Sequence, residues 1–212
     1  MKFDLYVITD EAIAGGRSHT SIARLAVAGG ADVIQLRDKM QGSADLIRVG
    51  REIREITRDA GAGFIVNDRL DIALACGADG VHLGQGDLSP VVARQLAPPG
   101  FIIGVSVGCL SEARRAEQDG ADYVALSPTF STGSKSDAGA GHGCGMLAEI
   151  CRSVSVPVIA IGGIGPENIP AVIRAGATGI AVISAVVAQP DITAAARGLA
   201  FIVAEEKRKL PV

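Results

Sequence analysis

The sequence predicts a single-domain (β/α)8 barrel, the TIM-barrel architecture, over residues 1–212. Short apolar runs alternate with helical patterns along the whole chain, as in alternating β/α folds with a parallel sheet. The runs are mostly continuous, as expected for strands that are covered on both faces. A short glycine-led motif recurs before every second run. No linker or charge run marks a second domain, and the one long loop is the glycine-rich segment at about 127–145, an expected lid.

Eight apolar runs are the expected strands: residues 5–9, 33–36, 64–66, 80–83, 102–105, 123–126, 158–161 and 179–183. Helices are expected between them, including residues 43–59, 111–119, 146–153, 166–175 and 191–207. Because serine favours helix N-caps, Ser43, Ser89 and Ser111 are predicted caps, and Pro166 suits a first helical turn.

The recurring motif reads Gly-Ala-Asp at residues 30–32, 77–79 and 120–122, and Gly-Ala-Thr at 176–178. Each copy ends a predicted helix, where glycine is free to adopt positive φ, and leads into the second, fourth, sixth or eighth strand. Recurrence at every second strand suits a closed barrel, in which alternate strands fill alternate interior layers. The alternative is a generic turn of a doubly wound sheet, which the absence of GxGxxG after the first strand weakens.

Composition argues against several classes of partner. A net charge of −3, no Trp, two Tyr and five Phe argue against a nucleic-acid surface. No run approaches ~18 apolar residues, so no membrane span is expected. The first residues lack a basic segment followed by a long apolar run, and the cysteine spacing matches no zinc pattern, so a cytoplasmic location with reduced thiols is expected. The oligomeric state, including a homo-oligomer, stays open.

The second predicted strand carries the most informative polar residues. Side chains alternate along a strand, so Gln35, Arg37 and Lys39 share one side. Barrel active sites lie at the carboxyl ends of the strands, and arginine and lysine there are suited to phosphate. We therefore expect a phosphate-binding cluster at the barrel mouth. An internal ion pair with Asp38 or Asp68 is the alternative.

Two carboxylates follow neighbouring strands, Asp68 after the third and Asp87 after the fourth. Carboxylates beside a cation cluster suggest Mg²⁺ shared with substrate phosphate oxygens, because Mg²⁺ typically uses one or two carboxylates. The alternative is that both residues cap the helices that follow.

The last two strands end in residues typical of phosphate-binding loops. Gly162 and Gly163 end the seventh strand and Ser184 follows the eighth, where barrels commonly bind phosphate through backbone N–H groups. A tight turn is the alternative. His82 lies within the fourth strand, and a hydrogen-bonded interior histidine is favoured over a catalytic base.

In this order these segments resemble the thiamine phosphate synthase family over almost the whole chain. The matching segments are residues 6–10 (YVITD), 35–39 (QLRDK), 67–69 (NDR), 81–87 (VHLGQGD), 104–106 (GVS), 127–130 (SPTF) and 161–164 (IGGI).

The resemblance implies an Mg²⁺-dependent transferase that joins 4-amino-2-methyl-5-(diphosphooxymethyl)pyrimidine to a thiazole phosphate and releases pyrophosphate. It implies that Asp68 and Asp87 ligate Mg²⁺, and that Arg37, Lys39 and Lys135 are catalytic. The implied pyrimidine diphosphate site is Gln35, Arg37, Asp38, Lys39, Asn67, Ser106 and Lys135. The implied thiazole phosphate site is Thr132, Gly133, Ser134, Gly163, Ile183 and Ser184.

The chain departs from the family pattern in its lid. The family's Phe-Pro-Thr-x-Thr-Lys is FSTGSK here, at residues 130–135, so a more flexible loop is expected. Gly108 stands where the family often has histidine. The alternative functions are a thiazole tautomerase-like relative and a non-catalytic phosphate-binding barrel. The first carries histidine where this chain has Pro128, and the complete set of cations and carboxylates argues against the second.

Overall fold

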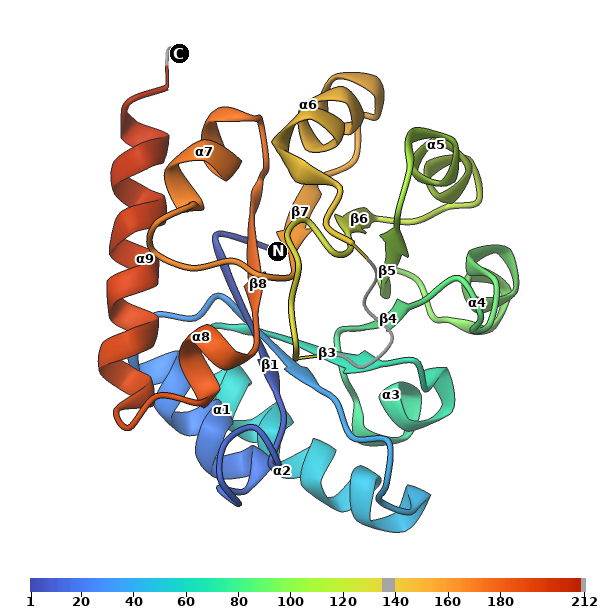
Figure 1. Cartoon of the computed structure of the whole chain (residues 1–212). Coiled ribbons are helices and arrows are strands. Elements are labelled where there is room, and N and C mark those ends of the chain that lie inside the picture. Colours follow the sequence, from blue (N-terminus) through green and yellow to red (C-terminus); the bar gives the residue numbers. More distant parts are fainter. Residues whose placement is uncertain (135–139, 211–212) are drawn as a thin grey trace.

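The structure is a computed structural model that describes residues 1–134 and 140–210. Its parallel strands close into one barrel in sequence order, which confirms the predicted fold (Figure 1). The strands are β1 (Leu5–Thr9), β2 (Val33–Leu36), β3 (Gly63–Asn67), β4 (Gly80–Leu83), β5 (Ile102–Val107), β6 (Tyr123–Leu126), β7 (Val158–Ile161) and β8 (Gly179–Val182).

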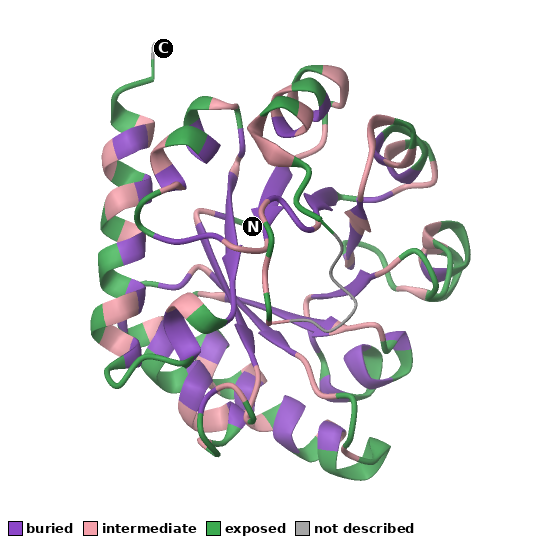
Figure 2. Ribbon diagram, in the orientation of Figure 1, coloured by how far each residue is buried: buried purple, intermediate pink, exposed green. Residues whose placement is uncertain are grey.

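Helices surround the barrel, and α9 packs against α1 and α7. They are α1 (His19–Ala28), α2 (Ser43–Ala60), α3 (Leu70–Cys76), α4 (Pro90–Leu96), α5 (Leu110–Gln118), α6 (Gly143–Ser153), α7 (Ile169–Arg174), α8 (Ser184–Val187) and α9 (Ile192–Arg208). The strands are almost wholly buried, whereas the helices bury only their inner faces (Figure 2). No helix within the described residues is long and apolar enough to cross a membrane.

The predicted helix starts are partly wrong. Ser89 caps α4 as predicted, accepting a hydrogen bond from the Val92 N–H. Ser43 is instead the first residue of α2, and its hydroxyl accepts from Arg69. Ser111 lies inside α5, whose preceding turn is held by a Gly108 N–H bond to the Glu112 carboxylate. The helix expected from Pro166 begins only at residue 169.

The Gly-Ala-Asp repeat has a physical role at the start of the odd strands. Its last side chain accepts the backbone N–H of the preceding strand: Asp32 from Leu5 at 3.0 Å, Asp79 from Phe64 at 2.8 Å, Asp122 from Ile103 at 2.7 Å and Thr178 from Val158 at 3.2 Å. The backbone N–H of the same four residues returns a bond to the carbonyl of that strand residue. All four motif glycines have positive φ, which glycine adopts without steric cost.

The repeat therefore pairs each odd strand with the even strand that follows it. Because the motif precedes the even strands, these bonds lie at the amino ends of the strands, opposite the barrel mouth. This arrangement leaves the carboxyl ends available for polar side chains.

Candidate active site

A cavity of about 570 Å³ opens at the carboxyl ends of β2 to β6. We call it the charged cavity, because it gathers side chains of both charges. Its lining includes Arg37, Lys39, Asn67, Asp68, His82, Gln85, Asp87, Ser106, Ser127, Pro128 and His142. Six residues of the predicted diphosphate and metal sites thus face one volume: Arg37, Lys39, Asn67, Asp68, Asp87 and Ser106.

Arg37 is held in place by a carboxylate from the neighbouring strand. Its Nη1 donates to Asp10 Oδ2 at 2.8 Å, and both side chains are mostly buried. The ion-pair partner of Arg37 is therefore Asp10, which was not among the partners considered from the sequence. A carboxylate at this distance fixes the guanidinium while its other N–H groups remain for a ligand.

Asp38 does not line the charged cavity. Its Oδ2 lies 3.1 Å from His19 Nε2, and its Oδ1 accepts from the N–H groups of Met40 and Gln41. Burial raises the pKa of Asp38, but these two N–H donors and His19 outweigh it and hold the pKa below its usual value. His19 also contacts Thr9 Oγ1, at 2.7 Å, so it ties the loop after β2 to β1. No sequence pattern indicated this role for His19.

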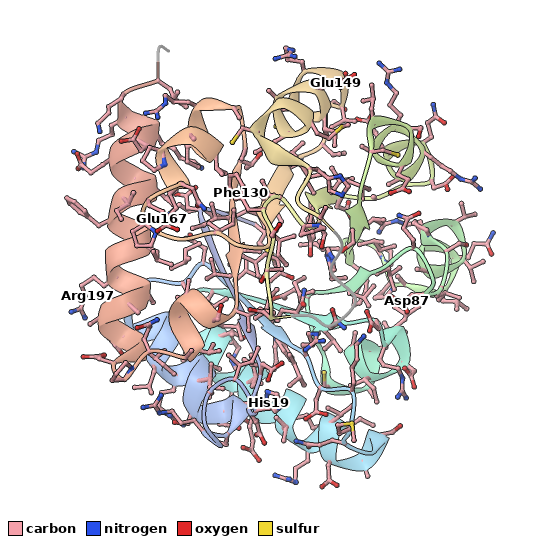
Figure 3. All side chains as sticks on the ribbon, in the orientation of Figure 1. His19, Asp87, Phe130, Glu149, Glu167 and Arg197 are labelled. Atoms are coloured by element: carbon pink, nitrogen blue, oxygen red, sulfur yellow. The ribbon has the colours of Figure 1, made fainter. Side chains whose placement is uncertain are left out.

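Asp68 and Asp87 approach the cavity from the loops that follow β3 and β4. Asp68 has φ of 62°, a left-handed conformation that is uncommon outside glycine and recurs at functional sites. Asp87 Oδ2 accepts from the Gly84 N–H at 2.7 Å. Neither carboxylate caps a helix, since α3 has no side-chain cap and Ser89 caps α4. Figure 3 shows Asp87 beside α4, and His19 far from it on α1.

The two carboxylates suit Mg²⁺, which can share its ligands with a substrate, better than they suit a metal ion that needs three or more protein ligands. Within the described ranges no group of three or more His, Cys, Asp or Glu side chains could hold a metal. Asp68 and Asp87 offer only oxygen atoms to one cavity, together with cations. Mg²⁺ is commonly bound by one or two carboxylates plus substrate phosphates and water, which is this donor set.

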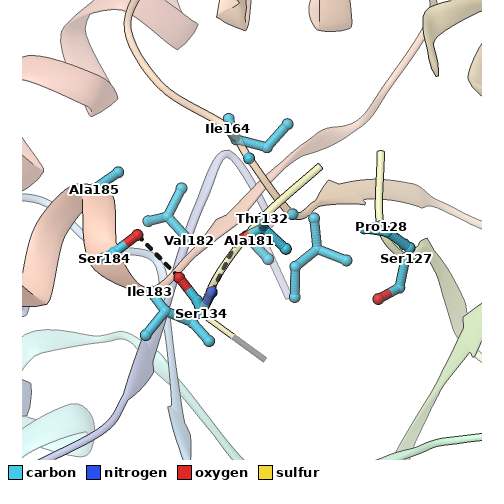
Figure 4. Close-up of a pocket in the computed structure, with 13 residues that line it drawn as sticks. Ser127, Pro128, Thr132, Ser134, Ile164, Ala181, Val182, Ile183, Ser184 and Ala185 are labelled. Atoms are coloured by element: carbon cyan, nitrogen blue, oxygen red, sulfur yellow. Dashed lines mark hydrogen bonds between the residues drawn. The ribbon is translucent and has the colours of Figure 1, made fainter. Parts of the chain in front are cut away.

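A second cavity lies between the ends of β7 and β8 and the loop after β6 (Figure 4). Five of the predicted thiazole-site residues line it: Thr132, Ser134, Gly163, Ile183 and Ser184. Gly133 is not among its lining residues. Its volume is about 40 Å³, and the Ser134 hydroxyl donates to Ser184 Oγ at 3.0 Å. Ser127 and Pro128 line both cavities, so the two share a wall.

Gly162 and Gly163 allow the loop after β6 to reach the end of β7. The N–H of Phe130 donates to the Gly162 carbonyl at 3.0 Å. A Cβ on Gly162 would meet Pro128 Cβ at 2.7 Å, and one on Gly163 would meet the Ser131 carbonyl oxygen at 2.6 Å. Both glycines also have positive φ. The two glycines thus form more than the tight turn considered from the sequence, because they also let the backbone of the loop after β6 approach closely.

Gln35 is a further predicted residue that does not line the charged cavity. Gln35 is buried below the charged cavity, where its Nε2 donates to the Tyr6 hydroxyl at 2.7 Å. Lys135 lies outside the described residues. His82 is a hydrogen-bonded interior histidine, as predicted, with Tyr123 and Ser106 as partners. His142 lines the charged cavity although its sequence context carried no signal, because only the folded loop brings it there.

A family model described as thiamine monophosphate synthase matches residues 5–186. The thiamine-phosphate synthase of Methanoregula boonei is 67% identical over 199 residues, which cover 94% of this chain and 92% of that protein. That of Methanoculleus marisnigri is 62% identical over 98% of both chains. A solved structure of thiamine phosphate pyrophosphorylase from Pyrococcus furiosus has a TM-score of 0.90, at 42% identity and 96% coverage of both chains. Matches of this extent, over the barrel and its mouth, show that the chain belongs to the thiamine monophosphate synthase family.

Proposed function

We propose that this chain is a thiamine-phosphate synthase, which condenses 4-amino-2-methyl-5-(diphosphooxymethyl)pyrimidine with a thiazole phosphate and releases pyrophosphate. The observation that carries the proposal is the meeting of Arg37 and Lys39 with Asp68 and Asp87 around one cavity. Cations alone would suit any anion, but cations beside two carboxylates suit a diphosphate bound with a divalent metal. Family membership supports the same reaction.

The charged cavity meets the main electrostatic demand of the reaction. The carbon–oxygen bond to the diphosphate breaks, and its electron pair stays on the departing oxygen. Pyrophosphate leaves readily only when this charge is stabilised by groups that are already in place. Arg37 is pre-oriented by Asp10, and Lys39 faces the same volume. Asp68 and Asp87 would hold Mg²⁺, which would supply further neutralisation of the diphosphate oxygens.

Bond formation needs no general base. The aminopyrimidine ring donates electrons to the exocyclic carbon as pyrophosphate leaves, and the thiazole nitrogen then attacks that carbon with its lone pair. The nitrogen carries no proton to lose, so atoms and charges balance without a proton acceptor. His82 is accordingly assigned no role as a base, and it lies in the barrel interior within hydrogen-bond distance of Tyr123 and Ser106. The protein's task is to orient both substrates and exclude water.

The thiazole phosphate is assigned to the second cavity, which must widen to receive it. A volume of about 40 Å³ is far below that of an ordinary ligand pocket. The Ser134–Ser184 hydrogen bond joins the loop after β6 to the start of α8. Breaking it frees two hydroxyls for the phosphate. The shared wall at Ser127 and Pro128 would then set the thiazole next to the pyrimidine carbon.

The decisive assay mixes both substrates with the purified chain, with and without Mg²⁺, and follows thiamine phosphate and pyrophosphate. We expect equal amounts of the two products, formed only with Mg²⁺. Arg37→Ala should lower kcat/KM by about 10²-fold, as for the loss of one pre-organised charge partner. Arg48→Ala is the matched control, because Arg48 is exposed on α2 and pairs only with residues of its own helix among the described contacts.

The metal assignment is tested by Asp68→Asn and Asp87→Asn, which keep the side-chain shape. Both should raise the Mg²⁺ concentration for half-maximal rate, whereas Asp45→Asn, on exposed α2, should not. Lys135→Ala tests the leaving-group role of Lys135, and unchanged turnover would contradict it. A folded chain that forms no thiamine phosphate, or forms it equally well without Mg²⁺, would refute the proposed function.

A further inference from the structure

A chain of hydrogen bonds crosses the barrel interior and ends at the charged cavity. Gln35 Nε2 donates to the Tyr6 hydroxyl at 2.7 Å, and Tyr6 and Tyr123 hydroxyls are 3.1 Å apart. The Tyr123 hydroxyl lies 2.9 Å from His82 Nδ1, and His82 Nε2 lies 2.9 Å from Ser106 Oγ. Of the five residues, Ser106 and His82 line the cavity, so the chain connects a buried amide to the ligand site.

These polar groups are deeply buried. Gln35 is 2% exposed, Tyr6 1%, Tyr123 0% and His82 5%. They come from β2, β1, β6 and β4, so no local sequence motif brings them together. A buried donor without an acceptor costs about 1–3 kcal/mol, so every proton in the chain is expected to have a partner.

Counting the protons gives the chain a direction. Gln35 Nε2 can only donate, so the Tyr6 oxygen accepts from it and the Tyr6 proton must go to Tyr123. The Tyr123 proton then has His82 Nδ1 as its acceptor. An Nδ1 that accepts bears no proton, so a neutral His82 carries its proton on Nε2 and donates it to Ser106 Oγ.

We propose that this series of hydrogen bonds holds His82 as its neutral Nε2–H tautomer. The Ser106 hydroxyl proton is thereby turned toward an anionic oxygen bound in the charged cavity. Ser106 accepts from His82 on one side and donates on the other. Gln35, Tyr6, Tyr123 and His82 are positioning residues that act through Ser106. The identification of the anion as a diphosphate rests on the proposed function, whereas the direction of the chain does not.

Both tyrosines retain the hydroxyl protons that this direction of donation requires. Burial raises the pKa of Tyr6 and Tyr123 well above the ordinary value for the phenol, so each keeps one proton. Gly104 provides the space for the Tyr123 ring, since a Cβ on Gly104 would lie 2.0 Å from Tyr123 Cζ. An acceptor-only ligand such as phosphate benefits from a hydroxyl whose proton has been left available.

The first test is the tautomer itself, read by long-range ¹H–¹⁵N NMR of the His82 ring in the full-length chain without substrate. We expect a protonated, pyrrole-like Nε2 and an unprotonated, pyridine-like Nδ1. A proton on Nδ1, or on both nitrogens, overturns the proposal. This measurement needs no turnover, so its failure is distinguishable from failure of the proposed function.

Two variants test what sets the direction. Gln35→Glu places a hydrogen-bond acceptor beside Tyr6, and we expect the chain to reverse and the His82 proton to move to Nδ1. An unchanged tautomer would refute the role given to Gln35. Thr57→Val is the matched control: it removes a buried hydroxyl that donates to backbone carbonyls of its own helix, away from the hydrogen-bond chain, so the tautomer should stay. Urea unfolding of both variants confirms that each is folded.

The link to the ligand is tested by titrating inorganic pyrophosphate with Mg²⁺. Ser106→Ala should weaken binding by about 10-fold, the value of one hydrogen bond to a charged group. Thr57→Val should leave the affinity within about twofold, because its hydroxyl bonds within α2 and takes no part in the hydrogen-bond chain, although the change removes a buried hydrogen bond. Equal affinity of Ser106→Ala and the unaltered chain would overturn the donor role of Ser106. So would a Thr57→Val loss as large as that of Ser106→Ala.

Discussion

The glycine at position 104 is expected to be essential for the interior of this barrel. A Cβ on Gly104 would lie 2.0 Å from Tyr123 Cζ, 2.3 Å from its hydroxyl oxygen and 2.4 Å from Cε1. No Cβ tolerates such contacts, so Gly104→Ala must displace the Tyr123 ring. The displaced ring cannot keep its hydrogen bonds to both Tyr6 and His82.

The cost of Gly104→Ala follows from these contacts. Overpacking a tight core costs about 1–3 kcal/mol, and each of two lost hydrogen bonds about 1 kcal/mol. We therefore expect a loss of roughly 3–5 kcal/mol in the free energy of unfolding. For a chain of this size, that corresponds to a fall in Tm of roughly 6–20 °C. Urea unfolding should show a lower midpoint at an unchanged slope.

Two further variants separate the clash from a general sensitivity to alanine. Gly198 lies on the exposed face of α9 with open space around its Cβ, so Gly198→Ala should stabilise the chain by about 0.5–1 kcal/mol. In a Tyr123→Leu background the clash is removed, so adding Gly104→Ala should cost less than about 1 kcal/mol. A Gly104→Ala chain as stable as the unaltered one, with the His82 tautomer retained, would show that this account of the interior is wrong.

Three other changes test separate parts of the structure. Gly163→Ala should lower stability by roughly 2–4 kcal/mol in urea unfolding, because its φ is 61° and its Cβ would meet the Ser131 carbonyl oxygen. Asp79→Ala should cost about 1.5–3 kcal/mol, since the Phe64 N–H loses a charged acceptor, while pyrophosphate affinity stays unchanged. Asp38 has a lowered pKa, so its stabilisation is present above pH 3.8 and is lost as pH falls through the depressed value. Asp38→Asn should therefore flatten the acid side of a stability–pH curve, and an unchanged acid side would contradict this.

The strands could be predicted from the sequence because their pattern is local. Continuous apolar runs fixed β1, β2, β4, β6 and β7 at the residues observed, and β8 to within one residue. Helix starts were less predictable, because a cap depends on which partner takes the hydroxyl. Ser43 follows the pattern of a cap, but its oxygen accepts from Arg69, which is distant in sequence.

The candidate site also has parts that the sequence could predict and parts that it could not. The alternation that the sequence predicts through residues 35–39, which extend just past the end of β2, places Arg37 and Lys39 on the cavity side and Asp38 on the other, where it contacts His19. The resemblance alone had assigned Asp38 to the diphosphate. The partnership of Arg37 with Asp10 depends on β1 and β2 being neighbours, and the link from Tyr6 to Tyr123 joins β1 to β6 across the barrel interior. Such contacts have no local signature.

The structure separates the residues that hold the barrel together from those that face the ligand. The repeat side chains bind backbone N–H groups at the amino ends of the odd strands, whereas cations and carboxylates line the carboxyl ends. The interior hydrogen-bond chain is the exception, because it lies in the core and still reaches the cavity through Ser106. Substitutions at the repeat should therefore change stability alone, while a reversal within the interior chain should change ligand binding at little cost in stability. That contrast cannot arise if the interior polar residues serve only to fill the barrel.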